Sequence, residues 1–219
     1  MWVKACIFDL DGVIVDTAKY HYLAWKRLAD GMGINFSEKE NERLKGVSRM
    51  ASLEIILGLG RKELPGAGKE KLAAQKNEWY VEYISRMTPD EILPGALEFI
   101  SELKGKGIKI GLGSASRNTP MILDRVGMID TFDAVADGNI VHRAKPDPEV
   151  FLMAAAMLGV DPLSCIVFED AVAGVEAALN AGMKCVGIGS REILKDAHIV
   201  IKGLNEMTMN KLELLENRI

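Results

Sequence analysis

Two acidic residues separated by one position follow the first apolar run of the chain, in Ala5-Cys6-Ile7-Phe8-Asp9-Leu10-Asp11-Gly12. The apolar run is typical of a buried strand in a parallel sheet. Two carboxylates at the end of such a strand repel each other, and each is costly to bury without a partner. A metal cation, or a reaction that uses both acids, would offset that cost. Asp-Gly also forms ordinary turns, so the pattern by itself leaves a plain strand-to-turn connection open.

Three later segments also carry residues that could do chemistry. The run Ser114-Ala115-Ser116-Arg117-Asn118 offers hydroxyls and backbone N–H groups at a helix start, where anions bind, although helix capping by Ser116 or Asn118 explains the same residues. Lys145 lies just before another helix start, where a cation gains nothing from the helix dipole, so we expect an anionic partner for it. A second acid pair, Glu169-Asp170, follows an apolar run near the end of the chain.

Alternating strand-like and helical patterns position these segments. Strands are predicted at Lys4–Phe8, Ile108–Gly113, Ala134–Ala136, Cys165–Glu169, Lys184–Ile188 and Ile199–Ile201. Helices are predicted between them at Ala96–Lys104, Thr119–Val126, Pro148–Leu158 and Ala173–Ala181. This alternation indicates an α/β fold with a doubly wound, mostly parallel sheet.

One long stretch, from about Thr17 to Met87, contains no good strand pattern. Amphipathic helical patterns cover Ala18–Met32, Glu38–Leu44, Met50–Leu57 and Lys69–Met87, and the glycine-rich segment Gly58–Gly68 is predicted to be a flexible loop. We therefore expect an all-helical cap domain at 17–87, inserted after the first strand into a catalytic core made of 1–16 and 88–219. The connecting segments would be Val15–Thr17 and Thr88–Gly95.

Ligands of open α/β sheets bind at the carboxyl ends of the strands, and all four chemistry-bearing segments follow a strand there. We expect Asp9, Asp11, Glu169 and Asp170 to hold a hard cation through oxygen, with Mg²⁺ as the predicted ion. Lys145 and Ser114 would bind a phosphate on the other side of that ion.

Composition limits the partners. The 219 residues are 48% hydrophobic with a net charge of −4 and no basic stripe, which argues against nucleic acid. No apolar run approaches the ~20 residues needed to cross a bilayer, and the segment before Asp9 is too short for a signal peptide. Cys6, Cys165 and Cys185 each lie in or beside an apolar run, as expected of reduced core thiols in a cytoplasmic protein. We expect a monomer.

The four segments together resemble the motifs of the haloacid dehalogenase-like superfamily: Asp-Leu-Asp-Gly-Val, a serine after the second strand, Lys-Pro-Asp-Pro, and Glu-Asp-x-x-x-Gly. The helical insert resembles that superfamily's type-one cap. The resemblance implies that Asp9 is a nucleophile forming an aspartyl-phosphate and Asp11 a general acid–base. It also implies Mg²⁺ held by Asp9, the Asp11 carbonyl, Asp170 and Glu169. Ser114, the Ala115 amide and Lys145 would hold the phosphoryl oxygens.

A second anion site would distinguish a mutase, whose intermediate carries a phosphate at each end, from a phosphatase. Leu44-Lys45-Gly46-Val47-Ser48-Arg49 supplies two cations, a hydroxyl and a glycine between predicted helices, although a solvated turn explains them too. Arg49 suits bidentate phosphate recognition. Ser116, Arg117 and Asn118 could face the same phosphate.

These residues are similar to the sugar phosphomutases of the superfamily, as are Asp16-Thr17-Ala18, His21, Ala24-Trp25 and Lys76-Asn77. The resemblance implies that His21 bonds to Asp11 and orients it, and that Lys76 contacts sugar hydroxyls. Trp25, Gly46, Val47 and Ser52 would shape the cap side of the cavity. The chain departs from the pattern at Arg117, where lysine is familiar.

The expected function is an Mg²⁺-dependent phosphomutase that interconverts β-D-glucose 1-phosphate and glucose 6-phosphate through β-glucose 1,6-bisphosphate. The alternatives are a sugar-phosphate phosphatase on the same fold and a non-catalytic protein that binds phosphorylated sugars. The Asp9/Asp11 pair argues against the last, because binding alone needs no acid–base group.

Overall fold

A parallel six-stranded sheet forms the centre of the computed structural model, which describes residues 3–44 and 47–215. Its strands are β1 (Ala5–Phe8), β2 (Lys109–Gly113), β3 (Ala134–Ala136), β4 (Cys165–Glu169), β5 (Lys184–Ile188) and β6 (Ile199–Ile201). They lie in the order β3-β2-β1-β4-β5-β6, so β1 pairs with both β2 and β4. The predicted doubly wound fold is confirmed, and the reversal of strand order beside β1 places a binding crevice at its carboxyl end.

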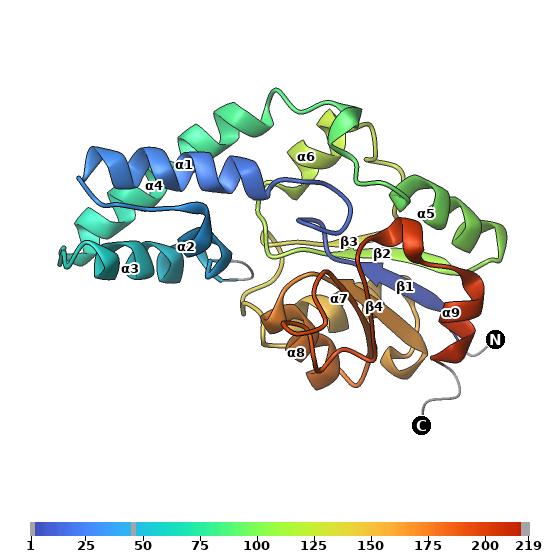
Figure 1. Ribbon diagram of the computed structural model, residues 1–219. Helices are drawn as coiled ribbons and strands as arrows, with labels where there is room; N and C mark the ends of the chain where they lie inside the picture. The colour runs from blue at the N-terminus through green and yellow to red at the C-terminus, as the bar shows by residue number, and fades with distance from the viewer. Residues whose placement is uncertain (1–2, 45–46, 216–219) are drawn as a thin grey trace.

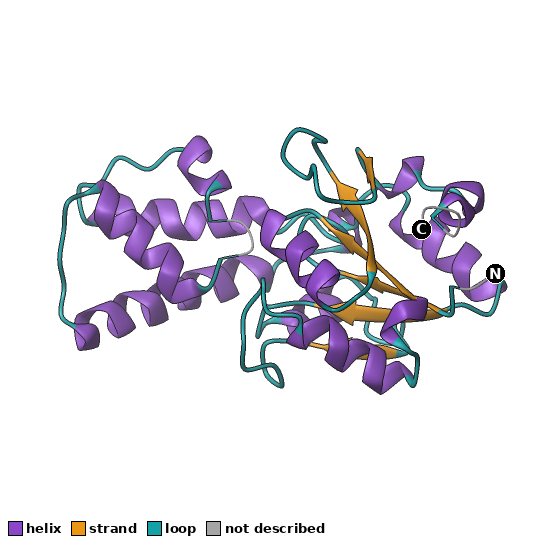
Figure 2. Cartoon of the chain, turned by 90° about the horizontal axis from the view of Figure 1, so that it is seen from below, coloured by secondary structure: helices purple, strands orange, loops and turns teal. Residues whose placement is uncertain are grey.

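Helices cover both faces of the sheet (Figures 1 and 2). Side chains alternate along each strand, so Cys6 and Phe8 face one hydrophobic core while Ala5 and Ile7 face the other. The first core is closed by α5 (Ala96–Gly105), α6 (Thr119–Arg125) and α9 (Met209–Leu214), and the second by α7 (Glu149–Leu158) and α8 (Val172–Asn180). Both faces of β1 are therefore buried, which explains its uninterrupted apolar sequence.

Between β1 and β2 the chain leaves the sheet and forms a separate helical part (Figure 1). It contains α1 (Ala18–Gly31), α2 (Glu38–Glu42), α3 (Arg49–Leu59) and α4 (Gly66–Ile84). These helices share their own hydrophobic core, to which Trp25, Phe36 and Ile56 contribute. The core on one face of the sheet also includes Ala24 of α1 and Tyr80 and Ile84 of α4, so the helical part packs both on itself and on the sheet.

The two connections between this helical part and the sheet run side by side. Val15 bridges to Ile92, the Asp16 amide donates to the Glu91 carbonyl at 3.1 Å, and the Leu93 amide donates to the Ile14 carbonyl at 2.9 Å. Glu91, in the short 3₁₀ helix Pro89–Glu91, also accepts a hydrogen bond from the hydroxyl of Tyr20 at 2.5 Å. The predicted connectors therefore pair with each other rather than running as two independent linkers.

The glycine-rich loop predicted at Gly58–Gly68 is wrong at both ends. α3 continues through Leu59, and α4 begins at Gly66, directly after Pro65. Glycine lowers helix propensity, but packing of Leu72 and Ala73 against the helical core outweighs that cost in the following turns. α9 and the 3₁₀ helices Pro162–Ser164 and Leu204–Glu206 are further elements that the sequence pattern did not predict.

The remaining predictions from composition concern cysteines and membranes. Cys6, Cys165 and Cys185 are all buried and free, as expected of core thiols. Over 3–44 and 47–215, no helix combines the length and the apolar character needed to cross a bilayer.

Substitution of Phe168 tests how much the core on one face of the sheet contributes to the stability of the fold. Its ring stacks on Phe8 with centroids 4.6 Å apart and meets Phe99 edge-on at 5.5 Å. We expect Phe168→Ala to lower the free energy of unfolding by about 3–5 kcal/mol, because it leaves a cavity between β4 and α5. Urea denaturation measures the change. Leu163→Ala is the control, since that side chain is 70% exposed and should change stability by less than about 0.5 kcal/mol. Equal effects would contradict the role given to this core.

Candidate active site

Asp9, Lys145 and Glu169 meet at the carboxyl ends of β1 and β4. The Lys145 ammonium donates to Asp9 Oδ1 at 2.5 Å, to Glu169 Oε2 at 2.8 Å and to the Gly113 carbonyl at 3.2 Å. All three side chains are buried. Asp9 is fixed further because its amide donates to the Phe168 carbonyl of the neighbouring strand. The anionic partner predicted for Lys145 is thus a pair of carboxylates.

Asp9, Glu169 and Asp170 form a group suited to a metal ion. One carboxylate oxygen from each lies within 4.8 Å of the others. Gly12 makes room for this approach, because a Cβ there would lie 2.3 Å from Asp170 Oδ2, and its φ of +80° also favours glycine. Three carboxylates with only oxygen donors fit a hard cation such as Mg²⁺.

Burial and mutual repulsion perturb the protonation of these acids. Burial, followed by the charge of Asp9, raises the pKa of Glu169 to about 8, while Lys145 acts in the opposite direction. Burial alone would lower the pKa of Lys145, but Asp9 and Glu169 outweigh it and raise that pKa above its ordinary value. Lys145 is therefore held as a cation. An additional cation at this group would relieve the same repulsion among the carboxylates.

Asp11 contacts a residue other than the predicted one. The hydroxyl of Thr17 donates to Asp11 Oδ1, whereas Nδ1 of His21 lies 2.9 Å from the Lys76 ammonium. The expected His21–Asp11 hydrogen bond is thus not the contact this structure holds, because Thr17, at the start of α1, lies closer to the carboxylate. Burial, then the charge of Asp9, raises the pKa of Asp11 to about 6, which suits an acid–base group near neutral pH.

Lys76 is buried rather than solvated. It is 2% exposed, and its ammonium lies 4.7 Å from the ring centroid of Trp25 and 4.6 Å from that of Tyr80. Burial, then the charge of Arg49, lowers the pKa of Lys76 to about 7, and burial with the charge of Lys76 lowers the pKa of His21. Trp25 thus belongs to the helical core, and its ring also packs against the Lys76 ammonium.

The loop after β2 is held by its own hydroxyls. The fully buried Ser114 accepts from the Ser116 amide at 3.1 Å, and Ser116 Oγ accepts from the Asn118 amide at 3.1 Å. The Ala115 carbonyl passes so close to Gly138 that a Cβ there would lie 2.5 Å from its oxygen. Arg117 Nε donates to the Gly138 carbonyl at 3.1 Å. This loop is therefore fixed before any ligand binds.

A chain of side chains joins this loop to the helical part. Arg49 Nη2 donates to Asn77 Oδ1 at 2.7 Å, and Asn118 Nδ2 donates to the same oxygen at 3.4 Å. Partial burial, then the charge of Arg117, lowers the pKa of Arg49, so the two guanidinium groups repel each other. An anion between Arg49 and Arg117 would relieve that repulsion.

The other residues expected around this second site lie at the start of α3. Ser48 is exposed and caps the helix by accepting from the Ala51 amide, Val47 is half-buried, and Ser52 is buried. Lys45 and Gly46, which were expected to contribute to the same site, lie outside the described residues.

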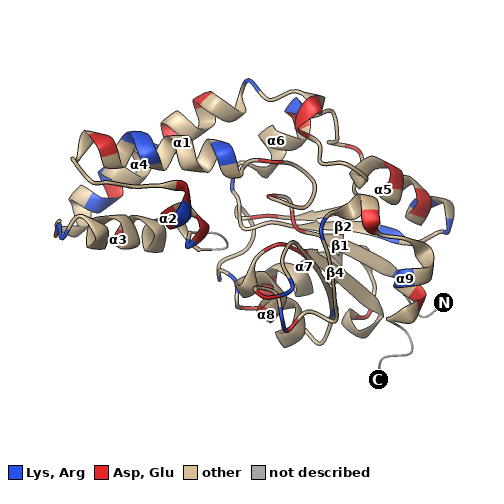
Figure 3. Cartoon of the chain, viewed as in Figure 1, with Lys and Arg blue, Asp and Glu red and all other residues tan. Residues whose placement is uncertain are grey.

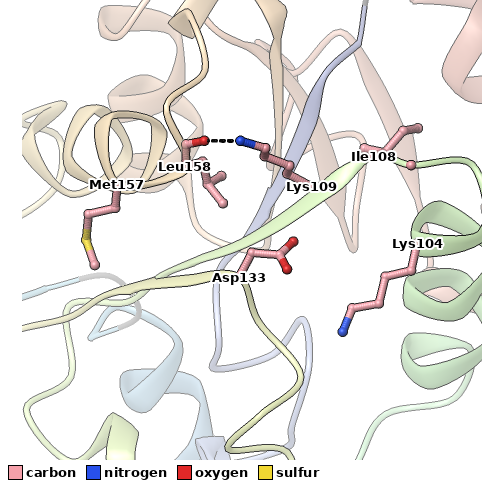
Figure 4. A pocket seen from close by; sticks show the side chains of 7 residues that line it. Lys104, Ile108, Lys109, Asp133, Met157 and Leu158 are labelled. Carbon is pink, nitrogen blue, oxygen red and sulfur yellow. Dashed lines mark hydrogen bonds between the residues drawn. The ribbon is translucent and has the colours of Figure 1, made fainter.

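A cleft of about 580 Å³ lies between the end of α2 and the core beside the metal-binding group. Asp170, Ala171 and Ser190 line it from the core, and Glu42 and Arg43 from the helical part. A second hollow of about 380 Å³ is found at the opposite end of the sheet, near Lys104, Lys109 and Asp133 (Figure 4). Lys109 there donates to the carbonyl of Leu158, which ends α7. The cleft beside Asp170 therefore adjoins the candidate site, whereas the hollow near Lys109 is far from it.

Acidic and basic positions are interspersed along both parts of the molecule (Figure 3). This distribution agrees with the absence of a basic stripe in the sequence. The charges that matter for the candidate site are instead few and local: the carboxylates with Lys145 on the core, and Arg49 with Arg117, whose charges affect each other.

Three residues of the site have no role predicted from the sequence, although Thr17 and Asn77 are among those that carry the resemblance. Thr17 bonds to Asp11, Asn77 bridges Arg49 and Asn118, and Tyr80 packs under Lys76 and His21. A signal for Tyr80 exists in the sequence, because it follows Lys76 by four residues and so lies on the same face of a helix. Thr17 and Asn77 act through contacts between segments far apart in the sequence, which spacing does not reveal.

A family model for haloacid dehalogenase-like hydrolases matches residues 3–182, which include every residue of the site described above. The chain belongs to that family. A β-phosphoglucomutase of Bacillus subtilis is 47% identical over 212 residues, which are 96% of this chain and 94% of that protein. The crystal structure of a β-phosphoglucomutase from Clostridium difficile superposes with a TM-score of 0.92 at 44% identity, covering 98% of this chain and 97% of that one.

Phosphatases are also among the relatives. A phosphorylated carbohydrates phosphatase of Thermotoga maritima is 31% identical over 185 residues, covering 83% of each chain. Family membership alone therefore does not distinguish transfer of the phosphate to a sugar from transfer to water.

Gly174 offers a test of the acidic group. A Cβ at this position would lie 2.0 Å from Cδ of Glu169, so Gly174→Ala must displace that carboxylate. We expect Mg²⁺ affinity, measured by isothermal titration calorimetry, to fall at least about tenfold. Gly58→Ala is the matched control: it is also a helical glycine but has open space around it, so it should leave the affinity unchanged and add up to about 1 kcal/mol of stability. Unchanged Mg²⁺ binding in Gly174→Ala would exclude Glu169 from the metal site.

Proposed function

We propose that the chain is a β-phosphoglucomutase, interconverting β-D-glucose 1-phosphate and glucose 6-phosphate. Identity of 47% over nearly the whole of the Bacillus subtilis relative supports this activity. The observation that carries it is the second cationic site, where Asn77 joins Arg49 of the helical part to Asn118, the residue after Arg117 of the core. A bisphosphorylated sugar has a phosphate for each of two sites, whereas a phosphatase substrate needs only one.

The chemistry divides into two transfers at Asp9. In the first, a carboxylate oxygen of Asp9 forms a bond to phosphorus while the bond from phosphorus to the sugar oxygen breaks. Asp11 gives its proton to that leaving oxygen. In the second, a sugar hydroxyl attacks the aspartyl-phosphate, loses its proton to Asp11, and frees Asp9. One acid–base group thus serves both directions, which suits a pKa near 6.

The residues that would hold Mg²⁺ are Asp9, Glu169 and Asp170, together with the backbone carbonyl of Asp11. When bound, this ion supplies positive charge that offsets repulsion between Asp9 and the phosphoryl oxygens. Lys145 contributes a second fixed positive charge to the same region. The Ser114 hydroxyl and the Ala115 amide would donate to the remaining phosphoryl oxygens.

We assign the residues of 17–87 to a cap that closes over the sugar. The paired connectors at Val15–Ile92 support a hinge at this boundary, and the contact of Asn77 with Asn118 brings the cap against the loop after β2. Closure would place Trp25, Lys76 and His21 around the sugar and would exclude water from the aspartyl-phosphate. Lys45, Gly46, Val47, Ser48 and Ser52 would complete the cap side.

The second candidate is a sugar-phosphate phosphatase, favoured by the identity of 31% to the Thermotoga maritima enzyme. It uses the same Asp9 and Asp11 chemistry, with water in place of the sugar hydroxyl. It gives no role to the pair Arg49 and Arg117, and for that reason we place it second.

A coupled assay of glucose 6-phosphate formation separates the two functions. Started with a trace of the bisphosphate, the enzyme should convert the β anomer of glucose 1-phosphate and leave the α anomer unchanged, with little release of free phosphate. Asp9→Asn should abolish turnover, because the amide is a poor nucleophile. Stoichiometric phosphate release from the wild-type enzyme, without glucose 6-phosphate accumulation from glucose 1-phosphate, would contradict the mutase.

Arg49→Ala tests the second phosphate site. We expect at least about tenfold weaker binding of the bisphosphate, since a charge-assisted contact is lost, while hydrolysis of a small phosphate ester stays within about twofold. Kinetics with each compound provide the measurement. Arg86→Ala is the control, because that arginine is exposed and pairs only with Glu82 of its own helix turn among the contacts seen in the described chain. A proportional loss of both activities would remove Arg49 from the distal site.

A further inference from the structure

Tyr80 carries a polar group that the mechanism above does not use. The side chain is 1% exposed, and over the described residues its hydroxyl has no hydrogen-bond partner. A buried hydroxyl without a partner loses its contacts with water and gains nothing in return. Phenylalanine would fill the same space without that cost, so the hydroxyl calls for a functional explanation.

The ring of Tyr80 lies at the centre of the residues that surround the acid–base group. It stacks on the His21 imidazole with centroids 4.1 Å apart, and the Lys76 ammonium lies 4.6 Å from its centroid. Thr17 and His21 are one turn apart at the start of α1, where the His21 amide donates to the Thr17 carbonyl. Lys76 and Tyr80 are one turn apart on α4. The two helices thus present these four side chains to one another.

Thr17 and Asp11 are close enough to Tyr80 to affect the pKa of its hydroxyl. After burial, the charge of Asp11 is the main cause that raises the pKa of the phenol, and the Thr17 hydroxyl acts against it. The Thr17 hydroxyl donates its one hydrogen bond to Asp11. The lone pairs of the hydroxyl oxygen can therefore still accept a hydrogen bond. The phenol O–H of Tyr80 is buried and has no partner in the described structure, so it is a donor available to that acceptor.

We propose that Tyr80 is a positioning residue for Asp11, donating its hydroxyl to the Thr17–Asp11 pair when a sugar phosphate is bound. Tyr80 O–H to Thr17, and Thr17 O–H to Asp11, then form a short relay that fixes the carboxyl group toward the leaving oxygen. The aromatic ring has the separate task of holding Lys76 and His21 in place. This inference rests on the proposed acid–base role of Asp11.

Tyr80→Phe separates the two tasks, because it keeps the ring and removes the hydroxyl. Proton transfer from Asp11 matters for a sugar leaving group, which is a poor anion, and matters little for p-nitrophenolate, which is a stable one. We expect kcat with the sugar phosphate to fall about tenfold with KM nearly unchanged. The rate of p-nitrophenolate release from p-nitrophenyl phosphate in a single turnover, which reports the first transfer alone, should stay within about twofold. The melting temperature should stay the same or rise, since an unpartnered polar group is removed.

Tyr83→Phe is the matched control, as it lies on the same helix and its hydroxyl accepts only a long contact, 3.4 Å, from exposed Arg27 in the described structure. It should leave both substrates unaffected. Thr17→Val tests the other end of the relay and should reproduce the selective loss on the sugar phosphate. The double variant Thr17→Val/Tyr80→Phe should lose no more than the larger single loss, because both act through one path.

Two results would overturn the proposal: equal losses on both substrates, which would indicate a packing role, or no loss on either. Additive losses in the double variant would also count against a shared relay. Failure of the proposed function is distinguishable from these outcomes. If the wild-type chain forms no glucose 6-phosphate and only hydrolyses sugar phosphates, the mutase is wrong, and the comparison of leaving groups still decides the role of Tyr80.

Discussion

Three carboxylates must share the ends of two adjacent strands, and their repulsion is the constraint that organises this molecule. β1 and β4 are neighbours in the sheet, so Asp9 and Glu169 are brought together by the backbone pairing itself. Lys145 lies between them and supplies the compensating charge from a different segment. Gly12 and Gly174 remain without side chains because the carboxylates occupy the space a Cβ would take. The fold thus gathers negative charge at one point. A buried lysine offsets the repulsion there, and two glycines leave room for the carboxylates.

The two proposed anion sites differ in how far they are formed before a ligand binds. The first is buried, hydrogen-bonded and formed within the core alone. The second is divided between Arg49 on the helical part and the loop around Arg117, and like charges there oppose assembly. Asn77 occupies the gap with a neutral oxygen that accepts from both sides. A ligand with negative charge at both ends therefore draws the two parts together, whereas a ligand with one phosphate satisfies only the site that already exists.

Sequence patterns predicted the sheet well because its strands are buried on both faces and punctuated by glycines. The acidic cluster was predictable for a related reason: parallel strands end at one edge, so residues that follow them must meet. Helix boundaries around Gly66 were missed, since packing overrode propensity. Contacts such as Thr17 with Asp11 depend on where α1 begins relative to the sheet, and spacing along the chain carries no information on that. The roles of Lys45 and Gly46 stay predictions.

The paired connection at Val15 and Ile92 has a mechanical consequence. Lys19 and Tyr20 both bind Glu91, so the first turn of α1 is fastened to the opposite connector close to Asp11. The connection between the helical part and the sheet thus lies beside Asp11, the proposed acid–base group. When a rigid part turns about a point, groups near that point are displaced less than groups far from it. If the cap closes as proposed, Thr17 would turn with little displacement beside Asp11. Arg49, which Asn77 joins to the loop after β2, would be displaced further, so that the same rotation would open or close its contact with the core.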